Sequence, residues 1–204
     1  MPLFKVGSIK DSCGMISFYN FHSRNKRGML VIAPDVSDNT IVRYLKPLQK
    51  EKLPDGITFN IVAGKKMYDI IGLHHSWIVF FSQKIIDILS QFIDMSDKCY
   101  PIVISGIEQQ YYVIHNLQAY YLLNKEKQLF IDSPRYYKVY PPYLPIFGID
   151  ATGTIVVSEE VKDALLKNKA SNIEFVECFG CTLEEYEEIK KNKSRTKVNV
   201  YRDK

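Results

Sequence analysis

A single Cys-x-x-Cys motif is the clearest group of residues whose type and spacing could do chemistry. Cys178 and Cys181 are separated by Phe179 and Gly180. This spacing suits thiol redox exchange, and it also supplies half of a four-ligand zinc site. The motif comes just before Thr182, a predicted helix N-cap, and no histidine follows it. We expect both cysteines to be structural, while a thiol redox role and metal binding stay open as alternatives.

The histidine pair and two serines have simple structural interpretations. His74 and His75 are adjacent, so on an extended chain their side chains point to opposite faces and make a poor chelating pair. Ser82 and Ser158 each lie where a strand is predicted to become a helix. A serine at that position can accept a hydrogen bond from the first helical turn, so an N-cap role explains both.

Motifs typical of catalysis do not occur in this sequence. The chain has no Gly-x-Ser-x-Gly, no phosphate-binding glycine loop and no His-Glu-x-x-His. A Cys–His dyad of Cys13 or Cys99 with His115 is compatible with the sequence, but no motif supports it. We therefore predict no catalytic residue, no cofactor and no metal site, and hence a protein that is not an enzyme.

The elements that hold the two serines form an internal repeat. Aligned without a gap, 77–81 lies over 153–157, and Ser82 falls on Ser158. Each serine is followed by an apolar stripe at helical spacing, and a second strand is predicted after each helix. The two stripes are Ile85, Ile86, Leu89, Phe92 and Ile93 in the first copy and Val161, Ala164 and Leu165 in the second.

The repeat and its flanking strands predict the fold class. We expect an α+β fold with a mostly antiparallel sheet, a duplicated strand–helix–strand unit, and helices packed on the sheet. One compact domain should contain a β-rich N-terminal part (1–66), the duplicated core with a tyrosine-rich β insert (67–189), and a basic tail (190–204). A final helix is predicted over 182–191 from its Thr-x-x-Glu capping box.

Charge is distributed unevenly along the chain. The net charge is +4, but residues 190–204 hold seven basic residues and one acid, which leaves the rest of the chain at −2. Residues 150–189 hold ten acids and three lysines. An acidic field repels nucleic acid and attracts basic partners. A solvated acidic face beside a solvated basic tail is the simpler alternative.

These acids and the paired tyrosines supply the candidate partner-binding residues. Adjacent tyrosines on a strand point to opposite faces, so one of each pair should be exposed, which suits protein contacts. An ordinary half-buried sheet would explain the tyrosines as well. The candidates are Glu160, Asp163, Glu184, Glu187, Glu188, Tyr120 and Tyr136.

Hydropathy and cysteine content indicate the compartment. The longest apolar run, Trp77–Phe81, is far shorter than the roughly 20 residues that span a bilayer. The first residues lack the apolar stretch of a signal peptide. With four cysteines and no export signal, free thiols are expected. We predict a cytoplasmic protein that does not interact with membranes.

Four segments carry a resemblance to a known family, and they are 111–116, 145–148, 154–165 and 173–175. The region 67–180, which contains them, resembles a bacterial family of immunity proteins from polymorphic-toxin and contact-dependent inhibition systems, formerly a domain of unknown function. The family usually places small residues and a glycine before its last strand, whereas this chain has 169–172, Lys-Ala-Ser-Asn.

The resemblance implies a function and a partner. An immunity protein, or antitoxin, would bind and neutralise a cognate and basic toxin by protein–protein contact in a bacterial cytoplasm, and an acidic surface would speed that capture. Two alternatives stay open. One is a thiol-dependent enzyme that uses Cys178 and Cys181, and the other is a general protein-interaction module without a toxin partner.

Overall fold

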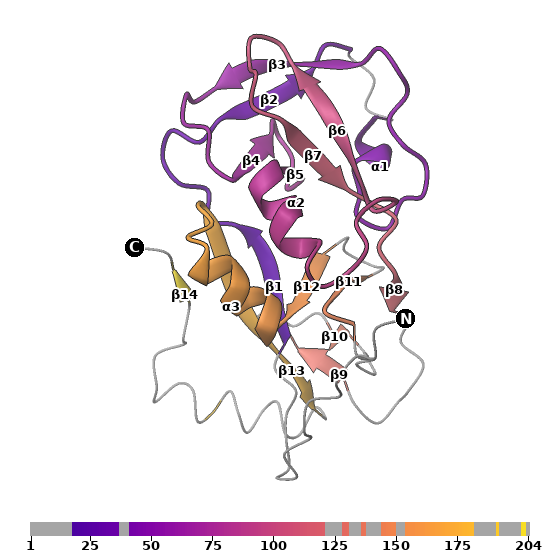
Figure 1. The fold of residues 1–204 in the computed structure, drawn as a ribbon, viewed down its shortest axis with the longest axis vertical. Coiled ribbons are helices and arrows are strands. Elements are labelled where there is room, and N and C mark those ends of the chain that lie inside the picture. The colour runs from indigo at the N-terminus through magenta and orange to yellow at the C-terminus, as the bar shows by residue number, and fades with distance from the viewer. Residues whose placement is uncertain are drawn as a thin grey trace.

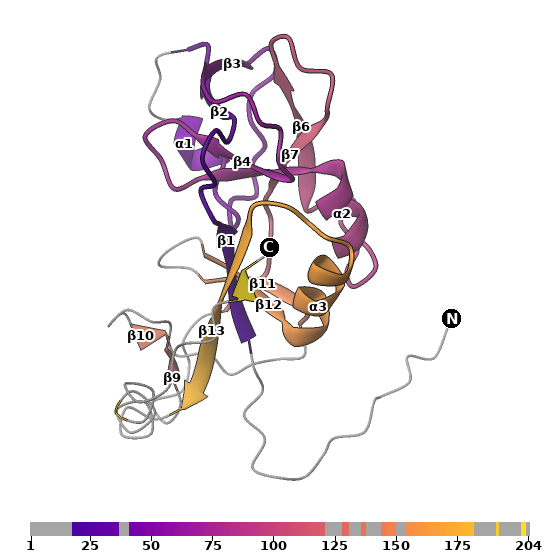
Figure 2. The same cartoon turned by 90° about the vertical axis from the view of Figure 1, so that its left-hand side faces the viewer.

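Strands dominate the computed structural model, which describes residues 18–36, 41–120, 128–130, 136–137, 144–149, 154–181, 191 and 201–202. Within these ranges the fold is α+β, with three short helices among many strands (Figure 1). The strands form two bodies, a closed barrel and an open sheet (Figures 1 and 2). The predicted α+β class is therefore confirmed.

The open sheet has the order β10-β9-β13-β1-β12-β11-β8, with β14 paired to β13. β1 lies at its centre, antiparallel to both β12 and β13, and its apolar residues Phe18, Tyr19 and Phe21 are buried. The strands are β1 (Phe18–Ser23), β8 (Ala119–Tyr120), β9 (Gln128–Phe130), β10 (Tyr136–Tyr137), β11 (Ile146–Ile149), β12 (Thr154–Ser158), β13 (Ile173–Cys181) and β14 (Tyr201–Arg202).

The barrel closes in the order β2-β3-β6-β7-β5-β4 around Phe59, Phe80 and Tyr111. The sequence did not predict it, because closure needs parallel pairing of β2 with β4 and of β3 with β6, and side-chain alternation does not reveal which strands pair. Its strands are β2 (Val31–Pro34), β3 (Thr58–Ala63), β4 (Ile70–Leu73), β5 (Val79–Ser82), β6 (Cys99–Ile104) and β7 (Tyr111–Ile114).

Helices α2 (Gln83–Leu89) and α3 (Glu159–Lys167) pack against each other where the barrel meets the sheet (Figure 1). α1 (Ile41–Tyr44) is a single turn beside the barrel. Ile85 and Leu89 of α2 and Val161 and Leu165 of α3 are fully buried in one shared core. The predicted apolar stripes thus form the junction of the two bodies.

Two strand–helix–strand segments have the same element order but different surroundings. In β5–α2–β6 and in β12–α3–β13 the two strands are separated by one antiparallel strand, β7 in the first case and β1 in the second. The first segment belongs to the closed barrel and the second to the open sheet. The structure therefore does not show the predicted duplicated unit.

The two serines differ in what they bind. Ser158 accepts a hydrogen bond from the Val161 amide at 3.5 Å, so the predicted N-cap of α3 is confirmed. The prediction for Ser82 is wrong, because its side chain makes no capping bond and its Oγ donates to Asp69 Oδ1 at 2.8 Å. Donation to a charged carboxylate makes a strong hydrogen bond, and the side-chain orientation that makes it leaves Oγ without a bond to the helix amides.

Asp69 ties the start of α2 to the turn between α3 and β13. Its carboxylate accepts bonds from the Ser171 amide at 2.7 Å and the Ser171 hydroxyl at 2.8 Å, besides that of Ser82. Lys84 lies 3.4 Å from the same carboxylate and donates to the Lys169 carbonyl at 3.0 Å. Burial alone would raise the pKa of Asp69, but these hydrogen bonds and the charge of Lys84 outweigh it and lower that pKa.

Asn172 connects the barrel to the sheet from a fully buried position. Its Nδ2 donates to the Ile70 carbonyl at 2.8 Å and to Ser23 Oγ at 3.1 Å, and its Oδ1 accepts from the Lys26 amide at 2.9 Å. Its φ of 62° is left-handed, a conformation that asparagine tolerates better than most residues. The 169–172 turn therefore forms without a glycine.

The predicted boundaries and the predicted last helix can be located relative to the described residues. The expected boundary at residue 66 lies between β3 and β4, which both belong to the barrel, and β1 belongs to the sheet. The predicted helix 182–191 and the basic tail 190–204 lie outside the described residues except for 191 and 201–202. No helix in the described ranges is long and apolar enough to cross a membrane.

Replacing Asn172 with alanine should destabilise the fold by about 2–4 kcal/mol, because buried partners lose their hydrogen bonds and alanine is strained at positive φ. Asn172→Gly loses the same bonds without the strain, so it should be about 1 kcal/mol more stable than Asn172→Ala. Urea unfolding followed by circular dichroism measures both. Equal stabilities of the wild type and Asn172→Ala would contradict this role.

Asp69 should make folding sensitive to acid. Its pKa is lower in the folded state than in the unfolded chain, so its stabilising effect is present above the ordinary aspartate pKa of about 4 and is lost as the pH falls through the folded value. We expect Asp69→Asn to be less stable at neutral pH and to lose less stability than the wild type on acidification. Denaturation midpoints from pH 7 to pH 2 test this, and parallel curves would contradict it.

Candidate functional site

Two candidate partner-binding residues lie together on the first turns of α3. Glu160 and Asp163 are both exposed and follow the capping serine, with Glu159 beside them. Carboxylates at a helix N-terminus interact favourably with the helix dipole, which favours this placement. We call Glu159, Glu160 and Asp163 the acidic turn.

A buried lysine lies beneath the acidic turn. Lys162 is only 3% exposed, and its Nζ lies 3.4 Å from both Glu159 Oε1 and Asp163 Oδ1. The same Nζ lies 4.1 Å from the ring centroid of Tyr19 on β1, a cation–π distance. The Tyr19 hydroxyl lies 3.5 Å from Glu159 Oε1 and donates to it. The acidic turn is thereby fixed to the central strand of the sheet.

The residues around Lys162 favour the charged form of its side chain. Burial alone would lower its pKa, but the Tyr19 side chain, the charge of Asp163 and the hydrogen bond with Glu159 outweigh it and raise that pKa. The ammonium group therefore stays charged at neutral pH. Among the described residues Glu160 forms no ion pair, so it is the acid of this turn that is most available to a partner.

The structure does not describe the side chains of the other candidate partner-binding residues. Tyr120 and Tyr136 lie in β8 and β10, of which the structure describes the backbone. Glu184, Glu187 and Glu188 lie outside the described residues. Glu160 and Asp163 are thus the part of the predicted surface that the structure brings together.

The Cys-x-x-Cys motif lies in β13. Cys178 pairs with Phe18 of β1, and Cys181 pairs with Gln128 of β9. The structure describes the backbone of both cysteines and not their side chains, so the expected structural role stays a prediction.

Cys99 and His115 each bind a backbone carbonyl. The Cys99 thiol donates to the Met95 carbonyl at 3.3 Å, and burial raises the pKa of that thiol. His115 is buried, its Nδ1 lies 3.2 Å from the Gln49 carbonyl, and burial lowers the pKa of its ring. A neutral thiol and a neutral imidazole with these partners are not arranged as a nucleophile and its base.

His74 and His75 lie in the turn between β4 and β5, where the chain is not extended and His75 has a φ of 54°. Their ring centroids lie 3.7 Å apart with the rings tilted by 44°, so the expectation that they point to opposite faces is wrong. That they make a poor chelating pair stays a prediction. No group of three or more His, Cys, Asp and Glu residues in the described ranges could hold a metal ion.

Lys162 and Tyr19 were missed by sequence reasoning. A lysine between Val161 and Asp163 on an amphipathic helix is ordinarily exposed, and Tyr19 lies 140 residues away from Glu159. The available signal was position, because Lys162 follows Val161 at the edge of the apolar stripe. That position does not reveal that the partner of Lys162 is Tyr19 on β1.

Comparison with protein-family models and with curated proteins gave no match. The resemblance to immunity proteins therefore stays a prediction.

Lys162→Met keeps the apolar stem and removes the charge, so it should destabilise the fold by about 1–2 kcal/mol, since the cation–π contact and both ion pairs are lost. Lys167→Met, at an exposed position on the same helix, is the matched control and should change stability by less than about 0.5 kcal/mol. Urea unfolding compares the two variants. Equal effects would show that Lys162 does not fix the acidic turn.

Proposed function

We propose that this chain is an immunity protein that binds and neutralises a cognate bacterial toxin by protein–protein contact. The observation that carries the proposal is the acidic turn held by Lys162 and Tyr19. Charged side chains that are fixed before binding lose less conformational entropy when a partner arrives. A surface of this kind suits recognition of a basic protein.

The charge of the acidic turn supports the expected partner. Its three carboxylates and Lys162 together carry −2, and Glu160 and Asp163 are exposed on α3. Complementary charge mainly raises association rates and specificity. An antitoxin must capture its toxin quickly, so fast association with a basic toxin fits this role.

Several partly or fully buried polar groups also favour binding over catalysis. Asp69, Ser82 and Cys99 use their hydrogen-bonding groups on structural partners that hold turns and strands together. A catalytic group needs capacity left for a substrate. We propose a non-catalytic protein of the bacterial cytoplasm whose two strand–helix–strand segments arose by duplication.

Two rival functions are separable by simple observations. A general interaction module would use the same acidic turn, but its gene would not follow a toxin gene. A thiol enzyme would need a cysteine of low pKa, which titration with a thiol reagent would detect.

Co-expression with the product of the gene directly upstream tests the function itself. We expect that product to stop bacterial growth alone and this chain to restore growth. Growth arrest that this chain does not relieve would contradict the proposal.

Charge reversal tests the surface. Glu160→Lys with Asp163→Lys should slow association with that toxin roughly tenfold at low salt, with a smaller effect at high salt. Asp55→Lys with Glu108→Lys changes the charge equally at two exposed barrel positions and should leave the rate unchanged. Stopped-flow or surface-binding kinetics measure both, and equal rates for the two double variants would remove the acidic turn from the interface.

A further inference from the structure

β3 has an open edge at its C-terminal half. Its pairing with β6 covers only Thr58 and Phe59, whereas its pairing with β2 continues to Ala63. The Ser105 amide closes the β6 side by donating to the Phe59 carbonyl at 2.9 Å, and the chain turns away after it. In the described ladder, Asn60–Ala63 therefore has a partner on one side only.

The alternation of hydrogen bonds shows which groups the open edge presents. The Asp35 amide donates to the Thr58 carbonyl at 2.9 Å, so Thr58 and Asn60 direct their backbone groups toward β2. Phe59 and Ile61 direct theirs to the opposite side, where β6 satisfies only Phe59. A β-bulge follows Ile61 and turns Ala63 back toward its partner Val31 on β2. The N–H and C=O groups of Ile61 are thus available for one more strand.

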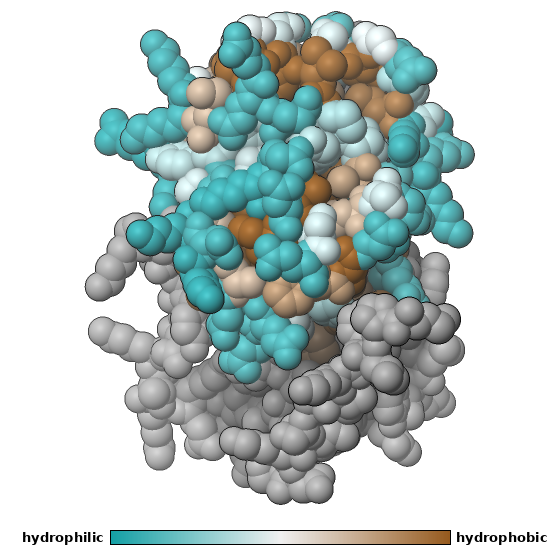
Figure 3. Space-filling view, viewed as in Figure 1, coloured by the Kyte–Doolittle hydropathy of each residue, from teal (hydrophilic) through white to brown (hydrophobic). Residues whose placement is uncertain are grey.

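Exposed apolar side chains surround this edge. Ile61 is 44% exposed, Val62 is 46% exposed, and Val103 on β6 is 63% exposed. Figure 3 shows apolar surface gathered at this end of the barrel, which is the end remote from the sheet in both ribbon views (Figures 1 and 2). An open strand edge with exposed apolar residues is a feature that proteins normally protect or use. Pro101 protects β6, since it has no N–H to offer, whereas β3 has no proline and is interrupted only by the β-bulge after Ile61.

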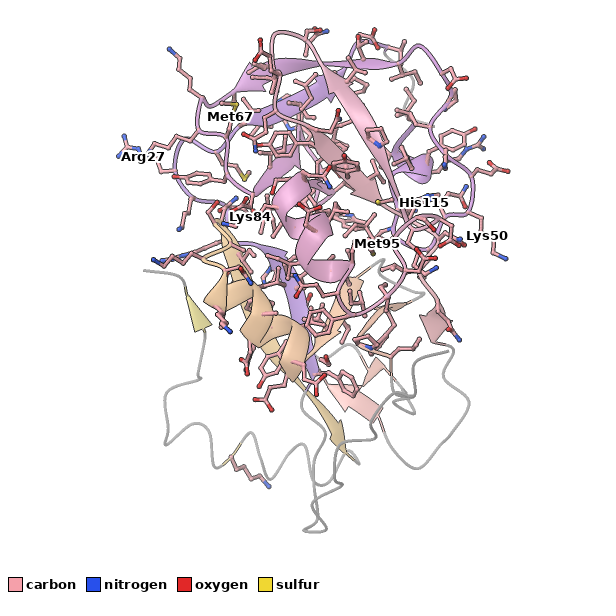
Figure 4. All side chains as sticks on the ribbon, in the orientation of Figure 1. Arg27, Lys50, Met67, Lys84, Met95 and His115 are labelled. Atoms are coloured by element: carbon pink, nitrogen blue, oxygen red, sulfur yellow. The ribbon has the colours of Figure 1, made fainter. Side chains whose placement is uncertain are left out.

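A cationic group lies where the edge ends. Lys65, Lys66 and Arg27 are exposed, and the Lys65 and Lys66 amides donate to the Gly28 carbonyl, which holds the two loops together. None of the three forms an ion pair with a described residue. Met67, 50% exposed, lies on the same side of the barrel as Arg27 (Figure 4).

We propose that the β3 edge binds an extended, acidic and apolar segment of a partner protein as an added β-strand. Main-chain bonds to Ile61 would give affinity, and alternate apolar side chains would contact Ile61, Val62 and Val103. Carboxylates of the segment would pair with Lys65, Lys66 and Arg27. This surface is separate from the acidic turn and does not depend on the proposed toxin.

The charges decide between occupants. A second copy of this chain would bring its own Lys65 and Lys66 to the same region, where like charges repel. Nucleic acid would gain from the cations but not from the apolar side chains or the open main-chain groups. An acidic strand uses all three features of the surface.

A synthetic peptide tests the proposal on the full chain. The probe is a capped, fluorescein-labelled seven-residue peptide in which valines alternate with glutamates, and fluorescence polarisation measures its binding. We expect saturable binding, with slower amide hydrogen exchange at Ile61 in the complex. The same peptide with N-methyl groups on alternate backbone nitrogens keeps its charge but cannot pair as a strand, so it should bind at least tenfold more weakly.

Variants of the chain locate the binding. Ile61→Pro removes an N–H that no described strand uses, so the fold should persist while peptide affinity falls about tenfold. Lys65→Glu with Lys66→Glu should weaken binding to a similar extent, whereas Lys50→Glu with Lys52→Glu, an equal change at exposed positions, should not.

Several results would overturn the proposal. One is the absence of peptide binding at millimolar concentration. The others are binding of the N-methylated peptide, or of a peptide with lysines in place of the glutamates, with the same affinity as the original peptide. Sedimentation that shows dimers of the wild type but not of Ile61→Pro would assign the edge to a second copy. Tighter binding of single-stranded oligonucleotide than of peptide, lost in Lys65→Glu with Lys66→Glu, would assign the cations to nucleic acid.

Discussion

The packing of a closed barrel against an open sheet depends on two polar side chains, the fully buried Asn172 and the half-buried Asp69. Both act at the turn before β13, where Asn172 reaches the barrel at Ile70 and where Ser171 binds the Asp69 carboxylate. Hydrophobic contact between α2 and α3 drives the two bodies together, but it is not directional. The hydrogen bonds fix one orientation, because a buried donor or acceptor left without a partner is costly.

That orientation separates two surfaces with opposite character. The acidic turn lies on α3 beside the sheet, and the open β3 edge with its lysines lies at the far end of the barrel (Figures 1 and 4). The net charge of the chain hides this division. Each surface is built on regular elements whose other face is buried, so each is rigid before a partner binds. Such a molecule is suited to specific protein recognition.

Local physics made parts of this protein predictable. The apolar stripes around Ile85 and Val161 predicted both helices, and Ser158 predicted the start of α3. Prediction failed where a competing long-range partner existed. The Ser82 hydroxyl binds Asp69 instead of the amides of its own helix. The Lys162 ammonium group lies over the ring of Tyr19 on the central strand.

The sequence alone determined the α+β class, the two core helices and the position of Glu160 and Asp163 on one turn. These follow from side-chain periodicity and capping, which act within a few residues. Only the tertiary structure decided the barrel, the open edge of β3 and the burial of Lys162. Strand pairing joins segments such as β2 and β4, or β1 and β13, across long stretches of chain, and the energy that selects one pairing exists only when the whole core is packed.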